Sequence, residues 1–319
     1  MAGVSVRARA KLNLTLHVGA VQSDGYHPLD SYVAFADFGD EVAACPAEGL
    51  SLAIDGPFAD ALAGGPLETN LALRAARALE ETARTLGRAP GGRARGADIR
   101  LTKNLPIASG VGGGSADAAA VLWALNTLWD LRLPSGELEA LGFTLGADLP
   151  MCVRGAPARA LGAGERLSPA PAPPPVSILL VNPLVETPTG PIFRAFDAAL
   201  EAGEAASSPA LEGWPASFDG VHAFAEFLGR GRNDLQAPAI ALQPVVGDVL
   251  AALERSGAVL ARMSGSGATC FGLFGAADAA LAAQDAIQNA EPGWWTQVAR
   301  LDAASAIAPH IRQHSEEGP

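Results

Sequence analysis

Apolar and polar residues alternate along the first part of the chain. Every even position from Val4 to Val18 is apolar, whereas the odd positions between them carry hydroxyl, basic, amide or imidazole side chains. This period predicts a strand, or two strands joined by a bend, with one buried face. Lys11 and Asn13 then project from the polar face, about 7 Å apart at the usual strand rise. A solvated strand face is the simpler interpretation of these two residues.

Comparable patterns predict the remaining elements. We expect strands over residues 32–38, 41–44, 50–54, 99–103, 176–182, 258–263, 271–274 and 296–301. We expect helices over residues 69–86, 116–129, 192–202, 221–228, 245–255 and 276–289, and another capped by Ser135 and ended by Gly146. Both halves of the chain mix helices with strands, which indicates an α+β fold class.

Other segments carry the signals of turns and loops. Asp37–Gly39 is predicted to form a turn between two strands. Asp148 is expected in a loop, ahead of Pro150 and of a strand that begins near Met151. A lone aspartate in a loop is usually a cap or turn residue, so Asp148 gains interest only from the residues that accompany it.

A proline-rich segment marks the boundary between two domains. Five prolines fall between Ser168 and Ser177 and predict a semi-stiff linker. A length of 319 residues also suggests two domains. We therefore expect an N-terminal domain over residues 1–168, a C-terminal domain over 176–309, and a flexible tail over 310–319.

Composition narrows the class of protein. A net charge of −12 and a pI near 4.8 argue against a surface for nucleic acid or anionic membranes. Hydrophobic residues make up 49% of the chain, enough for sizeable cores. Three widely spaced cysteines indicate free thiols in a reducing compartment. No apolar run approaches the length of a membrane span or a signal peptide, so we expect a cytoplasmic protein.

The segment from Leu105 to Ala119 holds the most informative motif, L-P-I-A-S-G-V-G-G-G-S-A-D-A-A. Its four glycines fall within five positions and lead through Ser115 into an alanine-rich helix. Glycines let a ligand approach the main chain closely, and a helix N-terminus presents unpaired N–H groups and partial positive charge. The motif therefore predicts an anion site, most often for phosphate. A tight connection without a ligand is the simpler alternative.

Three better-known motifs do not fit the sequence. The chain has no Gly-Lys pair, which excludes a Walker loop. The dinucleotide pattern G-x-G-x-x-G meets Ser115 where its last glycine belongs. Asp37-Phe38-Gly39 mimics the metal-binding triplet of protein kinases, but no His-Arg-Asp precedes it.

Six motifs, in order, resemble those of the GHMP kinases, the superfamily of galactokinase, homoserine kinase and mevalonate kinase. They are A-K-L-N-L at 10–14, D-G-Y-H at 24–27, G-V-G-G-G-S-A-D-A-A at 110–119, L-G-A-D-L-P at 145–150, N-D-L at 233–235 and R-M-S-G-S-G-A at 262–268. Within the superfamily, D-G-Y-H and L-G-A-D-L-P are most similar to the kinases of diphosphocytidyl-methylerythritol in the non-mevalonate isoprenoid route. The likeness extends from about residue 8 to residue 275.

The resemblance implies a two-domain fold and an ATP site. An N-terminal domain like that of ribosomal protein S5 would pack beside a ferredoxin-like C-terminal domain, with the active site in the cleft between them. ATP would be a co-substrate, with Mg²⁺ as its counter-ion and no tightly bound cofactor. Its phosphates would lie on Pro106, Ile107, Ala108, Ser109, Gly110, Val111, Gly112, Gly113, Gly114, Ser115 and Ala116. The Mg²⁺ ligands are unknown, and Ser115 is one candidate.

The resemblance also implies roles for single residues. Asp148 would accept the proton of the acceptor hydroxyl, with Lys11 beside it and beside the transferred phosphoryl group. Tyr26 and Phe193 would stack on a cytosine ring whose edge His27 hydrogen-bonds. Further contacts to the substrate would come from Asn13 and Thr189. The third motif loop would consist of Ser264, Gly265, Ser266 and Gly267.

The function implied is ATP-dependent phosphorylation of the 2-hydroxyl of the cytidine-diphosphate-linked sugar alcohol, by a monomer or weak homodimer that binds neither nucleic acid nor membrane. Two alternatives stay open. Another GHMP kinase with a smaller alcohol substrate would have no use for stacking aromatics at Tyr26 and Phe193. A non-catalytic ligand sensor on the same fold would have no use for Lys11 and Asp148 together.

Overall fold

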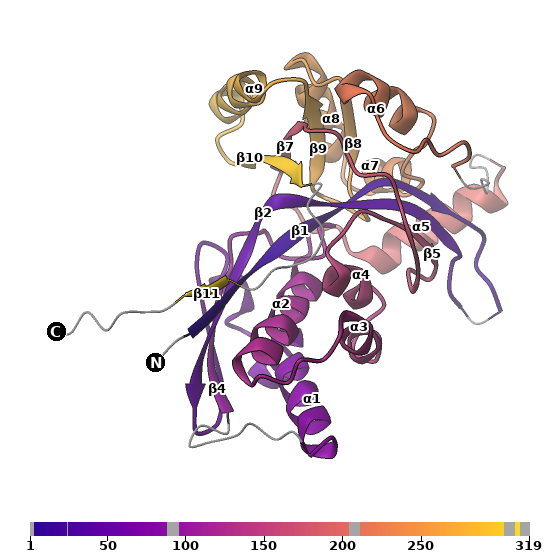
Figure 1. Cartoon of the computed structure of the whole chain (residues 1–319). Helices are drawn as coiled ribbons and strands as arrows, with labels where there is room; N and C mark the ends of the chain where they lie inside the picture. The colour runs from indigo at the N-terminus through magenta and orange to yellow at the C-terminus, as the bar shows by residue number, and fades with distance from the viewer. Residues whose placement is uncertain (1–2, 24, 88–95, 204–210, 303–309, 313–319) are drawn as a thin grey trace.

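The computed structural model describes residues 3–23, 25–87, 96–203, 211–302 and 310–312 (Figure 1). The strands are β1 (Gly3–Val18), β2 (Leu29–Ala47), β3 (Leu50–Asp55), β4 (Gly96–Thr102), β5 (Ala158–Gly162), β6 (Arg166–Pro169), β7 (Ser177–Asn182), β8 (Leu260–Met263), β9 (Cys270–Phe274), β10 (Trp295–Asp302) and β11 (His310–Arg312). The α-helices are α1 (Leu71–Thr85), α2 (Gly113–Leu128), α3 (Ser135–Phe143), α4 (Leu149–Arg154), α5 (Thr189–Glu201), α6 (Gly220–Gly229), α7 (Gln236–Leu242), α8 (Val245–Arg255) and α9 (Ala277–Ala290).

One hydrogen-bonded path of strands connects the two halves of the chain. Its order is β11-β1-β2-β10-β7-β9-β8, while β4 and β5 also pair with β2. Among the described residues the junction is short, since β10 meets β2 at Leu301↔Ala36 and Asp302↔Phe35. In Figure 1, α1 to α4 lie on one side of the long β1 and β2 strands, and β7 to β10 lie with α6, α8 and α9 on the other side. The α+β fold class predicted from the sequence is confirmed.

Helices α1 and α2 form where the sequence predicts them, with one change in where α2 begins. Asn70 caps α1, since its side chain accepts a hydrogen bond from the N–H of Ala72 at 2.9 Å. Helix α2 begins at Gly113 rather than Ala116, so the last two glycines of the loop and Ser115 belong to its first turn. Its alanines are buried in a core shared with β1, β2 and α1. The phosphate-loop motif therefore runs directly into a buried helix.

Strand β1 differs from the strand predicted in one respect. Its polar face is not solvated, because Arg9, Lys11, Asn13, Thr15 and His17 are all buried. The apolar side chains of β1 enter three apolar clusters, and its polar side chains meet polar partners, such as Asp148 at Lys11 and Ser31 at Asn13. A buried polar side chain must find hydrogen-bond partners, so this face is built for contact rather than for solubility.

Several local predictions are wrong. Asp37–Gly39 is not a turn but part of β2, at the register shift opposite Ala10. The strands expected at 32–38 and 41–44 are therefore one continuous strand. Ser135 does not cap α3, since Pro134 holds the N-cap position. The segment after Asp148 is the helix α4 instead of a strand, because Pro150 is well tolerated in a first helical turn. Helix α7 was not predicted.

The predicted flexible tail is partly a paired strand. Residues 310–312 form β11, which pairs antiparallel with residues 3–5 of β1. The rest of that segment, residues 313–319, lies outside the described residues. Among the helices that the structure describes, none is by itself long and apolar enough to span a membrane. Helices α7 and α8 meet those criteria only as a pair, and they are bent by 120° at the break between them.

Candidate active site

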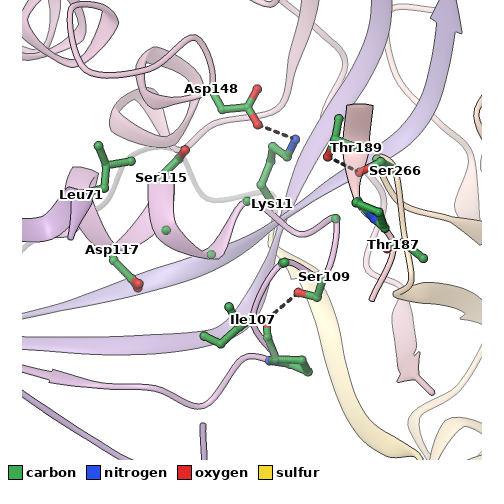
Figure 2. Close-up of a pocket in the computed structure, with 18 of the residues that line it drawn as sticks. Lys11, Leu71, Ile107, Ser109, Ser115, Asp117, Asp148, Thr187, Thr189 and Ser266 are labelled. Atoms are coloured by element: carbon green, nitrogen blue, oxygen red, sulfur yellow. Dashed lines mark hydrogen bonds and ion pairs between the residues drawn. The ribbon is translucent and has the colours of Figure 1, made fainter. Parts of the chain in front are cut away.

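A cavity of about 750 Å³ lies where the two halves of the chain meet. Its lining comes from β1, the glycine loop, the start of α2 and Asp148 on one side, and from the segments around Thr187 and Ser266 on the other. Figure 2 shows side chains from all of these segments directed toward one space. Lys11 and Ser266 thus share one site, although 255 positions separate them in the sequence.

The glycine loop wraps the base of this cavity. Gly110 and Gly112 both have positive φ, at 75° and 66°, a conformation that glycine adopts without strain. The N–H of Lys11 donates a 2.9 Å hydrogen bond to the carbonyl of Val111, which ties the loop to β1. Gly112 also passes close to Lys11, because a Cβ there would lie 3.2 Å from the Lys11 side chain. The loop, the N-terminus of α2 and Lys11 therefore form one unit.

The third motif loop holds the glycine loop from the other side. The hydroxyl of buried Ser264 donates to the carbonyl of Gly110 at 3.0 Å and accepts from the N–H of Asn13 at 3.1 Å. The N–H of Thr269 donates to the carbonyl of Ser109 at 3.1 Å. A Cβ on Gly110 would stand only 2.3 Å from the carbonyl oxygen of Ser264. One serine thus links all three motifs, and the close contact requires glycine.

Lys11 and Asp148 form an ion pair at the cavity. Lys11 Nζ lies 3.3 Å from Asp148 Oδ2 (Figure 2). The lysine side chain is 6% exposed, whereas the carboxylate is 45% exposed and open to a ligand. Asp148 holds the N-cap position of α4 without making a side-chain cap hydrogen bond, so its carboxylate is not used by the helix. An ammonium and an accessible carboxylate at one point can both contact a reacting group.

A buried cluster of three charges supports the glycine loop. Lys103 binds the carboxylates of Asp40 and Asp117, and Asp40 also accepts from the N–H groups of Asn104 and Leu105 at 2.6 and 2.8 Å. Burial raises the pKa of Asp117 to about 8, a larger effect than the attraction of Lys103. The second oxygen of Asp117 is buried without a partner among the described residues. The cluster ties β2, the end of β4 and α2 together.

The residues expected at the substrate divide into two groups. Asn13, Thr189 and Phe193 line the cavity, and the Thr189 hydroxyl lies 3.0 Å from that of Ser266. Tyr26 and His27 are not among the lining residues. Tyr26 is 63% exposed, in the connection between β1 and β2, and His27 contacts Phe193 at 4.7 Å between ring centroids. Phe193 thereby joins the second group to the cavity.

Most of the predicted ATP loop also lines the cavity. Within 106–116 the exceptions are Val111 and Ala116, whose side chains are buried in the apolar cores. Of the third motif loop, Gly265 and Ser266 line the cavity, while Ser264 and Gly267 support it from behind.

Sequence reasoning missed other lining residues. They include Lys103, Asp117 and Thr187, together with Ile54, Leu62, Leu67 and Leu71, which give one end of the cavity apolar side chains. Asp117 stands inside the glycine motif and could have been noticed there. A single lysine at a strand end and apolar residues from three segments give no comparable signal.

The comparisons with known proteins agree with this geometry. The model of the GHMP kinases N terminal domain matches residues 70–156, and that of the GHMP kinases C terminal matches residues 218–292. Together they match more than half of the chain, so the protein is a GHMP kinase with the two-domain α+β fold of that class. A solved homoserine kinase from Cytophaga hutchinsonii has the same fold, with a TM-score of 0.64 at 18% identity over 97% of each chain.

Proteins that are more similar to this chain define its family within the GHMP kinases. A 4-diphosphocytidyl-2-C-methyl-D-erythritol kinase of Paramagnetospirillum magneticum is 46% identical over 94% of this chain and 99% of its own length. One from Cereibacter sphaeroides is 50% identical over 92% and 98%. A crystal structure of 4-(cytidine 5'-diphospho)-2C-methyl-D-erythritol kinase has a TM-score of 0.68 at 32% identity, covering 93% and 98%. The chain belongs to the 4-diphosphocytidyl-2-C-methyl-D-erythritol kinase family.

The close contact at Gly110 generates a first prediction. Gly110→Ala should weaken ATP binding about 10-fold or more, because an L-residue with positive φ costs about 1–2 kcal/mol and 1.4 kcal/mol is a factor of ten. Its Cβ would in addition meet the backbone of Ser264. Calorimetric titration of ATP into the folded variant measures the effect. Gly136→Ala, where a Cβ meets nothing within 4 Å, is the control. Unchanged ATP affinity in Gly110→Ala would mean that the loop does not depend on this contact.

The buried charge cluster generates a second prediction. Lys103→Met should lower the free energy of unfolding by about 3–5 kcal/mol, because it leaves two buried carboxylates unpaired. Lowering the pH should restore part of this loss, since buried carboxyls bind protons more readily in the folded than in the unfolded state. Urea unfolding at several pH values tests both statements. Arg132→Met, which breaks an exposed pair with Asp130, should change stability little. Equal losses in the two variants would contradict the prediction.

Proposed function

We propose that this protein transfers the γ-phosphoryl group of ATP to the 2-hydroxyl of 4-diphosphocytidyl-2-C-methyl-D-erythritol. The products are ADP and the 2-phosphate, an intermediate of the non-mevalonate route to isoprenoid precursors. The observation that carries the proposal is the Lys11–Asp148 pair, 3.3 Å apart, on the same cavity as the glycine loop. Phosphoryl transfer needs positioning and charge stabilisation above all, and these three parts supply both.

The polyphosphate of ATP binds on the loop from Pro106 to Ala116. The N–H groups at the start of α2 are not used within the helix, and the helix dipole favours negative charge at this end. Beyond the loop the cavity is lined by Ile54, Leu62, Leu67 and Leu71 together with Thr69 and Asn70, and its apolar part suits the flat purine ring. The nucleotide therefore lies along the cavity with its γ-phosphate toward Lys11.

Asp148 is the general base and Lys11 stabilises charge. The exposed Asp148 carboxylate accepts the proton of the 2-hydroxyl while the hydroxyl oxygen forms its bond to the γ-phosphorus. The bond from that phosphorus to the bridging oxygen breaks, and ADP leaves with the electron pair. The Lys11 ammonium, fixed by the buried strand, stabilises the negative charge on the phosphoryl oxygens.

The cytidine end of the substrate is recognised beyond the phosphate loop. Phe193 lines the cavity and Tyr26 exposes most of its ring, so the two can take the cytosine between them. His27, against Phe193, bonds the edge of the base. Asn13 and Thr189 contact the remainder of the substrate. The buried Oδ1 of Asn13 has no partner among the described residues and is an acceptor available for that purpose.

Mg²⁺ accompanies ATP as its counter-ion. Among the described residues there is no group of three His, Cys, Asp or Glu side chains that could hold a metal. A magnesium ion that is bound mainly by phosphate oxygens and water needs only one or two protein ligands, which fits these residues. Ser115, which lines the cavity at the start of α2, would be its protein ligand.

The domain boundary lies in the proline-rich segment after Ser168, which separates the two matched regions at 70–156 and 218–292. Residues from both halves of one chain line the cavity, so the proposed reaction needs no second subunit and suits a monomer or weak homodimer. Its acidic charge suits small-molecule substrates in the cytoplasm rather than nucleic acid or membrane partners.

The catalytic pair generates the third prediction. Asp148→Asn should lower kcat by about 100-fold or more, the usual contribution of a general base, while the affinity for ATP is largely kept. Steady-state kinetics and ATP titration on the same preparation measure both. Asp130→Asn makes the same chemical change on the surface, in a residue paired only with its neighbour Arg132, and should leave kcat unaltered. Near-normal turnover in Asp148→Asn would remove this residue from the role of base.

Substrate choice generates the fourth prediction. Tyr26→Ala should raise KM for the cytidine substrate roughly 5- to 150-fold, because stacking on a base contributes about 1–3 kcal/mol. KM for ATP should change little. Methylerythritol phosphate without the cytidine group should be a poor acceptor for the wild type, as should homoserine and mevalonate, since remote binding energy is then missing. Equal turnover with and without the cytidine group would favour a GHMP kinase of a small alcohol instead.

A further inference from the structure

Helix α5 holds the imidazole of His27 with two side chains. His27 Nε2 lies 2.7 Å from Oδ1 of Asp197, and the ring contacts Phe193 at 4.7 Å between centroids with a tilt of 43°. Phe193 and Asp197 stand four residues apart and so project from one face of the helix. The His27 and Asp197 side chains are only 11% and 29% exposed. One helical face therefore fixes both the plane of the imidazole and the direction of its Nε2 atom.

The carboxylate decides which nitrogen of His27 carries hydrogen. An ionised carboxylate only accepts hydrogen bonds, so Nε2 must be the donor in this pair. In a neutral imidazole the other nitrogen, Nδ1, is then an acceptor. Nδ1 has no hydrogen-bond partner among the described residues. His27 thus offers one uncommitted acceptor beside Phe193, which lines the cavity.

We propose that Asp197 is a positioning residue that makes His27 select cytosine over uracil. This inference rests on the proposed function and assigns one of its specificity determinants. Cytosine carries an amino donor at position 4, where the pyrimidine of the T and U type carries a carbonyl acceptor. An Nδ1 acceptor forms a hydrogen bond with the amino group of cytosine. In uracil, the carbonyl oxygen would instead face this acceptor with no hydrogen between them. A mismatch of this kind is how polar sites reject an analogue. Without the carboxylate, the imidazole is free to present Nδ1–H and to accept uracil.

Kinetics with two substrates test this role. The cytidine form and the uridine form of the diphospho-methylerythritol are compared at about pH 8, above the ordinary titration range of histidine. Asp197→Asn is the informative variant, because an amide can either accept from Nε2–H or donate to Nε2 and so no longer fixes the tautomer. The ratio of kcat/KM for cytidine over uridine should fall about 5- to 10-fold, through KM of the cytidine form, with kcat retained. Glu201→Gln, one turn further along α5, is the matched control and should keep the wild-type ratio.

The tautomer itself is measured in the free protein. The ¹⁵N NMR signals of His27, assigned with the variant His27→Gln, should show Nε2–H in the wild type and a mixture of tautomers in Asp197→Asn. An unchanged ratio and spectrum in Asp197→Asn would overturn the proposal. An equal loss of kcat/KM for both substrates would do so as well, because it indicates a purely structural role. A wild type that phosphorylates neither substrate would overturn the proposed function, while the NMR spectra would still decide whether Asp197 fixes His27.

Discussion

The close approach of Gly110 to Ser264 is the contact on which the active site depends. A Cβ on Gly110 would come within 2.3 Å of the Ser264 carbonyl oxygen, and the Ser264 hydroxyl bridges Gly110 and Asn13. This contact joins the glycine loop of the N-terminal half to the third motif loop of the C-terminal half. Because the Lys11 N–H also bonds the loop, the ammonium and the phosphate site are held at one distance. In the proposed function, the groups that would stabilise the transferring phosphoryl are therefore held in place by the fold itself, which is the preorganisation that such catalysis requires.

The groups that favour an anion at this site are local, whereas the negative net charge of the whole chain disfavours an anion. On a protein of net charge −12, the proposed ATP site offers a polyanion the main-chain N–H groups of a helix N-terminus and the ammonium of Lys11. Lys103 lies nearby, but its ammonium is bound by Asp40 and Asp117, so its role is to anchor the loop. Asp117 in that cluster has a pKa raised to about 8, which shows how strongly burial disfavours charge beneath the loop. An anion site on an acidic protein thus relies on geometry more than on the number of cations.

Helix α5 connects phosphate chemistry with recognition of the base. Thr189 begins the helix and contacts Ser266 of the third motif loop, Phe193 lines the cavity, and Asp197 holds His27. These residues stand four apart, so they follow one face of the helix from the catalytic end of the cavity outward. In the proposed function, specificity and catalysis share one rigid support.

The sequence by itself determined the α+β class and the long first strand, because periodicity is local, and the backbone requirements of its glycines predicted an anion site. Roles for Lys11 and Asp148 came only from the resemblance of the motifs. The sequence also indicated the family, since six motifs in order are specific enough. It was wrong where a local signal had two solutions: Asp37–Gly39 is a register shift within β2, and Pro150 begins a helix. Only the tertiary structure decided that the polar face of β1 is buried, that Lys103 is paired twice, and that Asp197 holds His27. These contacts join residues far apart in the chain, and no local pattern encodes which distant side chain will supply the partner that a buried polar group must have.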